Sequence, residues 1–270
     1  MTTLIETRVD EAAGWILLNN TRRKNAINYE MYDAMFEALD RFEKDERVRA
    51  VVVSGNGGNF SAGFDVTQGS PEPYRDFVRN VSGRLSKRLW YFSKPTIAAV
   101  EGYCIGGGFE LAMGADLVYS AEDAVMGEPE IDFFYIPDFN SIPCISLPRK
   151  AKEMIMLGLT VSGREAVEIG FANRAFAADR LRDEVSKVCR RIASLPVATM
   201  TIAKQGLNTA LDLQGFVNAI NHGEEMAAYN SEANKSNPDC LAFHEEIEKN
   251  GLRAALQRVR AGGILNSSGD

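Results

Sequence analysis

Three consecutive glycines, Gly106 to Gly108, restrict most strongly how this chain of 270 residues can fold. They follow the apolar segment 96–100 and precede Phe-Glu-Leu-Ala-Met at 109–113, which has the composition of a buried helix. Glycines at the start of a helix leave several backbone N–H groups unpaired beside the positive end of the helix dipole. The segment therefore predicts a site that stabilises negative charge.

Glu110 is the second unusual feature of this segment. It lies three residues after Gly107, so both fall on the same face of the predicted helix. Glutamates are rarely placed among apolar helix residues unless they are paired or functional. We predict that Glu110 acts on whatever the unpaired N–H groups hold, and the alternative is a solvated or capping glutamate.

A second glycine-rich segment, 58–65, reads Gly-Asn-Phe-Ser-Ala-Gly-Phe-Asp. It has the first and sixth glycines of a P-loop but continues with Phe64 and Asp65, where lysine and serine or threonine are required. The glycine triplet does not match the dinucleotide pattern G-x-G-x-x-G either. If the turn at Gly63 supplied a second N–H, the two segments would form an oxyanion hole, in which each donor contributes about 3 kcal/mol.

Composition and charge exclude several classes of protein. A formal net charge of -7 argues against a surface that follows nucleic-acid phosphates. The four cysteines are too widely spaced to suggest a zinc site or a disulfide framework, and no other metal motif is present. They are Cys104, Cys144, Cys189 and Cys240.

The chain shows no targeting or membrane segment. Charged residues, Glu6 and Arg8, precede any apolar run, which argues against a signal peptide. No window approaches the roughly 18 uninterrupted apolar residues of a membrane span. We expect a protein of the cytoplasm.

Hydrophobic periodicity predicts an α/β protein with strands in the first half and helices in the second. Asn28 is expected to cap a helix that ends at Lys44, and the residues before Pro95 are expected to end another. Expected strands are 4–9, 15–18, 49–55, 96–102 and 115–122, and expected helices are 28–44, 73–92 and several segments after 149.

Three segments together resemble the crotonase (enoyl-CoA hydratase/isomerase) superfamily. They read LNNTRRKNAIN, FSAGFD and GYCIGGGFELAMGADLVYSAEDAVMGEPEI, and with the C-terminal helices the resemblance covers nearly the whole chain. It implies a spiral of repeated ββα units over residues 1–195 and a helical region over 196–270 that is used to form a homotrimer or a dimer of trimers. It also implies an acyl-CoA thioester as substrate and no separate cofactor, because coenzyme A is part of that substrate.

The resemblance also implies roles for individual residues. The N–H groups of Phe64 and Gly107 match the two that hold the thioester oxygen. Glu110 and Glu130 match the two glutamates of hydratases, which together favour the hydration of a 2-enoyl-CoA to a 3-hydroxyacyl-CoA. Glu128, two residues before Glu130, is the other candidate and is otherwise interpreted as an exposed acid at a helix start.

The coenzyme would lie along the basic segment that begins near residue 20. Arg22 and Lys24 lie where the family binds the phosphates and the adenine, and the backbone at Ala26 and Ala62 resembles its adenine contacts. Asp65, directly after the expected oxyanion turn, would orient that turn. Adjacent basic residues are also common in solvated loops, which is the alternative interpretation.

The sequence departs from the family pattern after Glu130. Asp138-Phe139-Asn140 replaces a glycine-rich turn, and Pro143 should break the helix that usually follows. Four aromatic residues in this segment are expected to crowd or reshape the acyl pocket. They are Phe133, Phe134, Tyr135 and Phe139.

Asp138 lies eight residues after Glu130, a spacing that resembles dienoyl-CoA isomerases. Those enzymes usually carry an aspartate at the position of Glu110, so the match is incomplete. The alternative function is double-bond isomerisation of a dienoyl-CoA or enoyl-CoA with Glu130 and Asp138 as the acting pair. A purely structural interpretation is that Asp138 caps a helix start.

Other classes of function are less well supported. Ser61, in Asn-Phe-Ser-Ala-Gly, lacks the first glycine of a G-x-S-x-G nucleophile motif, and no spacing gives His222 or His244 a partner. A CoA-thioester hydrolase on this scaffold and a non-catalytic acyl-CoA-binding protein remain alternatives. The presence of Glu110, Glu130 and both glycine-rich segments argues against the non-catalytic interpretation.

Overall fold

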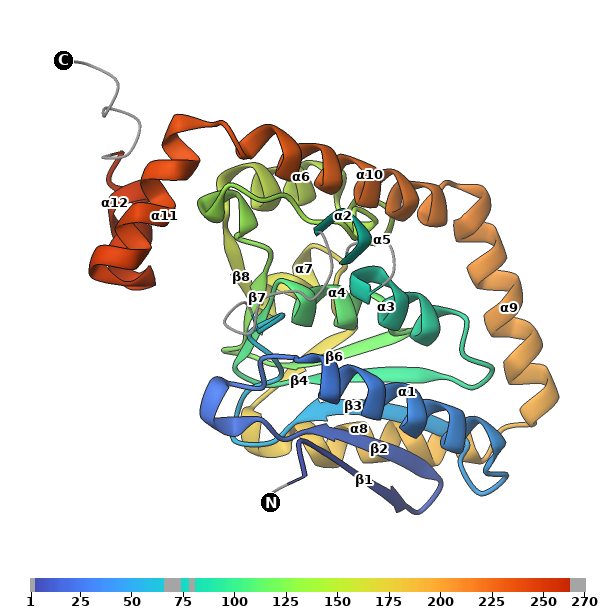
Figure 1. Cartoon of the computed structure of the whole chain (residues 1–270). Helices are drawn as coiled ribbons and strands as arrows, with labels where there is room; N and C mark the ends of the chain where they lie inside the picture. Colours follow the sequence, from blue (N-terminus) through green and yellow to red (C-terminus); the bar gives the residue numbers. More distant parts are fainter. Residues whose placement is uncertain (1–2, 66–73, 78–80, 263–270) are drawn as a thin grey trace.

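The computed structural model describes residues 3–65, 74–77 and 81–262, with side chains of all but 74 and 75 (Figure 1). Its larger sheet has the strand order β1-β2-β3-β4-β6-β9, with β1 antiparallel to β2 and the remaining pairs parallel. The strands are β1 (Ile5–Asp10), β2 (Ala13–Leu18), β3 (Ala50–Gly55), β4 (Thr96–Val100), β6 (Leu117–Ala121) and β9 (Arg174–Phe176). The predicted α/β class is confirmed.

A second sheet of three short strands connects the glycine triplet to the acidic segment at 128–130. Its order is β5-β7-β8, where β5 is Tyr103–Ile105, β7 is Val125–Gly127 and β8 is Thr160–Ser162. β5 and β7 are parallel, and the N–H of Gly106 donates to the carbonyl of Gly127 at 3.0 Å. This sheet therefore holds the start of helix α4 beside Glu128 and Glu130.

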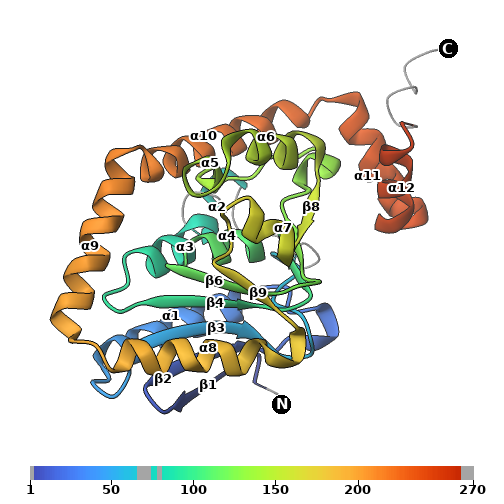
Figure 2. The same ribbon diagram turned by 180° about the vertical axis from the view of Figure 1, so that it is seen from behind.

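Two apolar layers cover the faces of the larger sheet. Alternate residues such as Trp15, Val52 and Ile97 are in register and share one face, which packs against helix α8 (Ala178–Ala193). The other set packs against helix α1 (Tyr29–Lys44), where the side chain of Asn28 accepts a hydrogen bond from the N–H of Met31 at 2.8 Å. Figures 1 and 2 show α8 and α1 on opposite sides of this sheet.

The other helices that the structure describes before residue 195 are shorter than α1 and α8. They are η1 (Thr21–Arg23), α2 (Tyr74–Phe77), α3 (Gly83–Trp90), α4 (Gly107–Met113), η3 (Glu130–Phe133), α5 (Ile142–Ile145), α6 (Pro148–Leu157) and α7 (Gly163–Glu168). Pro143 lies in the first turn of α5, where proline is tolerated, and the helix continues to Ile145, so the expected break at Pro143 is wrong.

Four helices form the C-terminal part: α9 (Val197–Leu213), α10 (Phe216–Asn234), α11 (Pro238–Asn250) and α12 (Leu252–Arg260). α9 runs along the edge of the molecule, and α10 crosses above α2 and α5 (Figure 1). The ammonium of Lys204 joins α9 to the body through an ion pair with Asp116 at 2.8 Å. No helix in the described ranges is both long and apolar enough to cross a membrane.

The structure corrects some expected elements. The turn between β1 and β2 is shorter than expected, with only Glu11 and Ala12 between the strands and Glu11 at a φ of 53°. The expected helix 73–92 contains α2 and α3, and its residues 73 and 78–80 lie outside the described residues, as do residues 263–270. All four cysteines are free.

The aromatic residues expected to crowd the acyl pocket have other contacts. Phe133 and Phe134 pack against Phe243 of α11, with ring centres 6.2 and 5.5 Å away. Phe139 is fully buried edge-on against Phe216 of α10. These three side chains attach the segment after Glu130 to the C-terminal helices. That they crowd or reshape the acyl pocket stays a prediction.

Candidate active site

The two glycine-rich segments lie side by side. The N–H of Ser61 donates to the carbonyl of Tyr103 at 2.8 Å, and the N–H of Ile105 donates back to the carbonyl of Ser61 at 3.0 Å. Gly63 has a φ of 91°, and a side chain on it would lie 3.3 Å from the nitrogen of Gly107. The sequence left open whether these segments meet, and the structure shows that they do.

The N–H groups of Phe64 and Gly107 have no backbone acceptor among the described residues. Gly107 is the first residue of α4, where backbone donors are free in any helix. Phe64 pairs with Ile27 in an isolated bridge. The hydrogen bonds of this bridge are donated by the N–H groups of Ile27 and Asp65, so the N–H of Phe64 takes no part in it. The arrangement suits an oxygen that gains negative charge.

Glu110 lies in the first turn of α4 and is 5% exposed. One carboxyl oxygen accepts from the N–H of Phe139 at 3.2 Å, and the other lies 3.5 Å from the hydroxyl of Ser82. Burial raises the pKa of Glu110 well above its usual range, and the charge of Asp138 and a hydrogen bond to it add to the rise. Glu110 therefore holds its proton at higher pH than an exposed glutamate does.

Glu130 begins η3, and one of its carboxyl oxygens lies against Gly106. The other oxygen, Oε2, is buried and has no hydrogen-bond partner within the described ranges. Burial, with the charge of Asp138 as a smaller contribution, raises the pKa of Glu130 to about 8. The start of α4 therefore lies next to a second acid that holds its proton near neutral pH.

Glu128 follows β7 and is 1% exposed, so the expectation of an exposed helix-start acid is wrong. Neither of its oxygens has a partner among the described residues. Burial raises its pKa well above the usual range, and the charges of Glu130 and Asp138 add to the rise. Sequence reasoning missed this burial because it follows from the pairing of β7 with β5 and β8.

Asp138 is 6% exposed and does not cap a helix, since Ser141 occupies the cap position of α5. Its carbonyl oxygen lies so close to Gly223 of α10 that no side chain fits there. The charge of Asp138 raises the pKa values of Glu110, Glu128 and Glu130, so these four residues form one acidic cluster.

The basic segment expected to hold the coenzyme lies against the oxyanion turn. The N–H of Ala62 donates to the carbonyl of Lys24 at 2.9 Å, and the ammonium of Lys24 lies 3.7 Å from the centre of the Tyr103 ring. Asp65 pairs with Arg23 at 2.8 Å, a partner that sequence reasoning missed. Arg22 and Lys24 are exposed, and Ala26 and Ala62 are half-buried.

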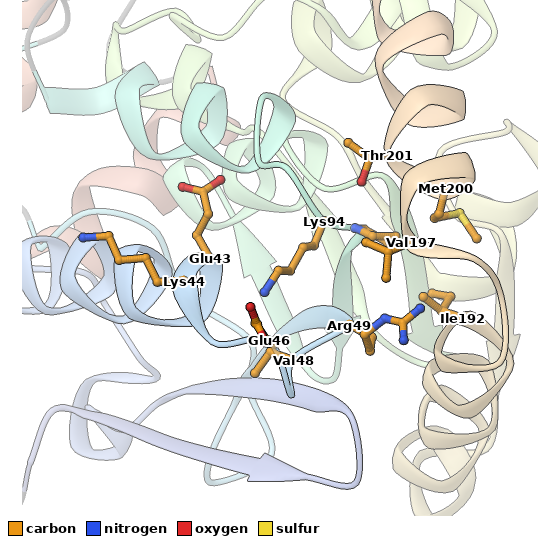
Figure 3. A pocket seen from close by; sticks show the side chains of 11 residues that line it. Glu43, Lys44, Glu46, Val48, Arg49, Lys94, Ile192, Val197, Met200 and Thr201 are labelled. Atoms are coloured by element: carbon orange, nitrogen blue, oxygen red, sulfur yellow. The ribbon is translucent and has the colours of Figure 1, made fainter.

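A cavity of about 360 Å³ lies elsewhere, at the amino-terminal ends of β3 and β4 (Figure 3). Its cations have structural roles. Lys94 donates to the carbonyls of Phe42 at 2.7 Å and Asp45 at 2.8 Å, and Arg49 donates to the carbonyl of Leu195 at 2.6 Å. The glycine-rich segments follow the opposite ends of the same strands, so this cavity is separate from the acidic cluster.

Comparison with known proteins gives consistent matches over most of the chain. The model of the family described as enoyl-CoA hydratase/isomerase matches residues 9–250. A putative enoyl-CoA hydratase of Thermus thermophilus is 31% identical over 221 residues, covering 76% of this chain and 87% of that protein. A carnitinyl-CoA dehydratase of Salmonella paratyphi A is 34% identical over 183 residues, covering 65% and 70%.

Solved structures show the same similarity. The crystal structure of an enoyl-CoA hydratase/isomerase from Xanthobacter autotrophicus Py2 has a TM-score of 0.90 and 35% sequence identity, covering 97% of this chain and 99% of that chain. A probable enoyl-CoA hydratase from Mycobacterium thermoresistibile has a TM-score of 0.80 and 31% identity, covering 86% and 98%.

Proposed function

Since the chain belongs to the enoyl-CoA hydratase/isomerase family, we propose that it adds water across the double bond of a 2-enoyl-CoA thioester to give a 3-hydroxyacyl-CoA. The observation that carries this proposal is that Glu110 lies in the first turn of α4 and that the carboxyl group of Glu130 lies against Gly106, directly before this helix. Two carboxyl groups at one site can divide the two proton transfers that hydration requires.

The thioester oxygen would accept hydrogen bonds from the N–H groups of Phe64 and Gly107. As water attacks C3, electrons move through the conjugated system to this oxygen, and an enolate forms. Because the two donors are free and fixed by the backbone, they stabilise the negative charge without rearrangement, with about 3 kcal/mol from each. Support for this role comes from the contact between Gly63 and Gly107.

The two glutamates would transfer the protons. One accepts a proton from water as the C3–O bond forms, and the other gives a proton to C2 as the enolate returns to the thioester. The raised pKa values of Glu110 and Glu130 support this division, because a neutral pH then leaves at least one proton in the cluster. Each assisted transfer contributes about a hundredfold or more to the rate.

The coenzyme would bind along η1. Arg22 and Lys24 would meet its phosphates, and the backbone at Ala26 and Ala62 would contact the adenine. Asp65 would contribute indirectly, because its ion pair with Arg23 holds the basic segment against the oxyanion turn.

We also propose a homotrimer, with or without pairing of trimers. Helix α9 exposes four large apolar side chains, and helices that are apolar on several faces are usually covered by protein. They are Val197, Ile202, Leu207 and Leu213.

A second candidate function is double-bond isomerisation, and the position of Asp138 favours it. Its buried carboxyl group shares a hydrogen bond with Glu110 and influences Glu130 through its charge. An additional acid at this place could move a proton between carbons of a dienoyl-CoA without adding water.

Mass spectrometry of products from 2-enoyl-CoA and 3,5-dienoyl-CoA thioesters tests both candidates. Hydration predicts a gain of one water in the 2-enoyl series. Isomerisation predicts an unchanged mass with a shifted double bond in the dienoyl series. Absence of reaction in both series would contradict both proposals.

A further inference from the structure

Three acids of the cluster carry oxygens that nothing in the described part of the chain satisfies. These are both carboxyl oxygens of Glu128, Oε2 of Glu130 and Oδ2 of Asp138. Glu128 and Asp138 are both more than nine-tenths buried, so bulk water does not solvate them either. The unpaired oxygens therefore call for a partner that the described part of the chain does not supply.

The energetic cost of leaving these oxygens unpaired is large. A buried polar group without a hydrogen bond costs about 1–3 kcal/mol, and the total for four oxygens would be a substantial part of the stability of one domain. Buried polar groups are generally satisfied by protein or by ordered water. A group that donates hydrogen bonds to these acids would therefore be stabilised.

The charged groups around the cluster do not supply this partner. Lys87 of α3 makes an ion pair with Glu224 of α10 at 2.5 Å. Cys104 of β5 lies near Glu128, but it is a buried thiol whose pKa is raised by burial. No group of three or more acids, thiols or imidazoles in the described ranges is arranged to hold a metal ion.

The acids come from different elements that meet beside α4. Glu128 directly follows the strand β7, Glu130 begins η3, and Asp138 lies in the loop before α5, where α10 packs against its backbone. The charge of Asp138 raises the pKa of both Glu128 and Glu130, which places the three groups within electrostatic reach of one another. Of the three, Glu130 lies against Gly106, directly before the start of α4.

We propose that Glu128 and Asp138 form a polar acyl subsite, and that this subsite takes an acyl group that carries a hydroxyl rather than an all-carbon chain. The proposal rests on the proposed acyl-CoA function of the site. A hydroxyl can donate a hydrogen bond to the unpaired carboxyl oxygens of Glu128 and Asp138, which a hydrocarbon chain cannot do. An all-carbon chain would leave the four oxygens unpaired after displacing water.

Such a subsite should discriminate strongly between acyl chains with and without a hydroxyl. A site built to bond a substrate hydroxyl rejects an analogue without that group, because the buried polar atoms are then left unpaired. A purely apolar pocket discriminates only weakly between similar chains. The ratio of kcat/KM values for matched substrates therefore measures whether the subsite is polar.

The experiment compares pairs of 2-enoyl-CoA thioesters of equal length. One member of each pair ends in a methyl group, and the other carries a hydroxyl at one of the carbons from C4 to C6. We expect a preference of about tenfold or more for at least one hydroxylated chain in the wild-type enzyme. Glu128→Met, similar in length but without donors or acceptors, should remove the preference, and Glu128→Gln should retain it.

Each outcome has a separate meaning. Equal or better turnover of every methyl-terminated chain by the wild-type enzyme would overturn the proposal, and this result needs no variant to fold. An unchanged ratio in Glu128→Met would also overturn it. A chain with a terminal ammonium that outcompetes the hydroxylated chains would show that the subsite is anionic, contrary to the proposal. Failure to hydrate any chain would contradict the proposed function instead.

Discussion

Glu110 and Glu130 are acids in surroundings that disfavour their charged forms. Burial is the main cause of the raised pKa of each glutamate, and the charge of Asp138 raises both pKa values further. The spacing from Gly107 to Glu110 allowed the first of these positions to be predicted from the sequence, because residues three apart share a helix face. The burial of Glu128 could not be predicted, because it depends on the pairing of β7 with β5 and β8, which the local sequence around Glu128 does not reveal.

Replacement of either glutamate by glutamine tests the proposed roles at this scale. Glu110→Gln and Glu130→Gln should each lower kcat by about a hundredfold or more, because glutamine cannot transfer the proton. The affinity for an unreactive saturated acyl-CoA should change little, since size and shape are preserved. Isothermal calorimetry and steady-state kinetics measure the two effects, with Glu168→Gln, an exposed glutamate of α7, as the control. Full turnover in either variant would remove that residue from the mechanism.

The raised pKa of Glu130 also predicts how stability depends on pH. The folded chain keeps the proton of Glu130 up to about pH 8, whereas the unfolded chain releases it near the ordinary value of 4.5. Stability from this group is therefore complete below about pH 4.5 and falls as the pH rises to 8, by up to about 1.4 kcal/mol per unit. The buried acids Glu110 and Glu128 act in the same direction.

Urea unfolding of wild type and Glu130→Gln between pH 5 and pH 8 measures this effect. The free energy of unfolding should fall with pH in the wild type and fall less steeply in the variant. Glu168→Gln should follow the wild type. Parallel curves for wild type and Glu130→Gln would show that Glu130 is not held in its neutral form.

At the scale of elements, the second sheet is the part of the fold that sequence patterns could not predict. β5, β7 and β8 have three residues each, which is too short for an alternating pattern to be recognised. The longer strands and α1 were predicted close to their observed ends, because their apolar residues recur with a clear period. The site depends on the short strands, so its assembly could not be predicted from periodicity alone.

Gly63→Ala tests the contact between the two glycine-rich segments. A side chain at Gly63 would lie 2.9 Å from the carbonyl oxygen of Ile105, and its φ of 91° is unfavourable for alanine. We expect a loss of about 1–2 kcal/mol in stability and at least a tenfold loss of activity, because the N–H of Phe64 is displaced. Glu168→Gln, at an exposed position of α7, is the control and should leave stability and activity unchanged. Unchanged kinetics in Gly63→Ala would argue against the proposed oxyanion hole.

At the scale of the molecule, the C-terminal helices pack against the segment that departs most from the family pattern. Phe243 of α11 contacts Phe133 and Phe134, and Gly223 of α10 contacts the backbone of Asp138. These contacts join positions about a hundred residues apart, and no local pattern predicts such pairs. The boundary near residue 195 and the use of this region in a trimer remain predictions.

The oligomeric state can be tested through α9. Ile202 and Leu213 are 67% and 85% exposed and lie eleven residues apart, which places them on the same helix face. Light scattering should give about three times the chain mass of 29.7 kDa, or twice that trimer mass if trimers pair. Changing both residues to glutamate should release monomers, whereas Asp183→Lys on α8 should not. A monomeric wild type would contradict the proposed trimer.

The most direct test of the proposed reaction follows a 2-enoyl-CoA in water enriched in oxygen-18. We predict that the wild-type protein forms a 3-hydroxyacyl-CoA containing the labelled oxygen, and that Glu110→Gln and Glu130→Gln lose this incorporation. A product of unchanged mass with a moved double bond, or label incorporated at the wild-type rate by both variants, would contradict the account.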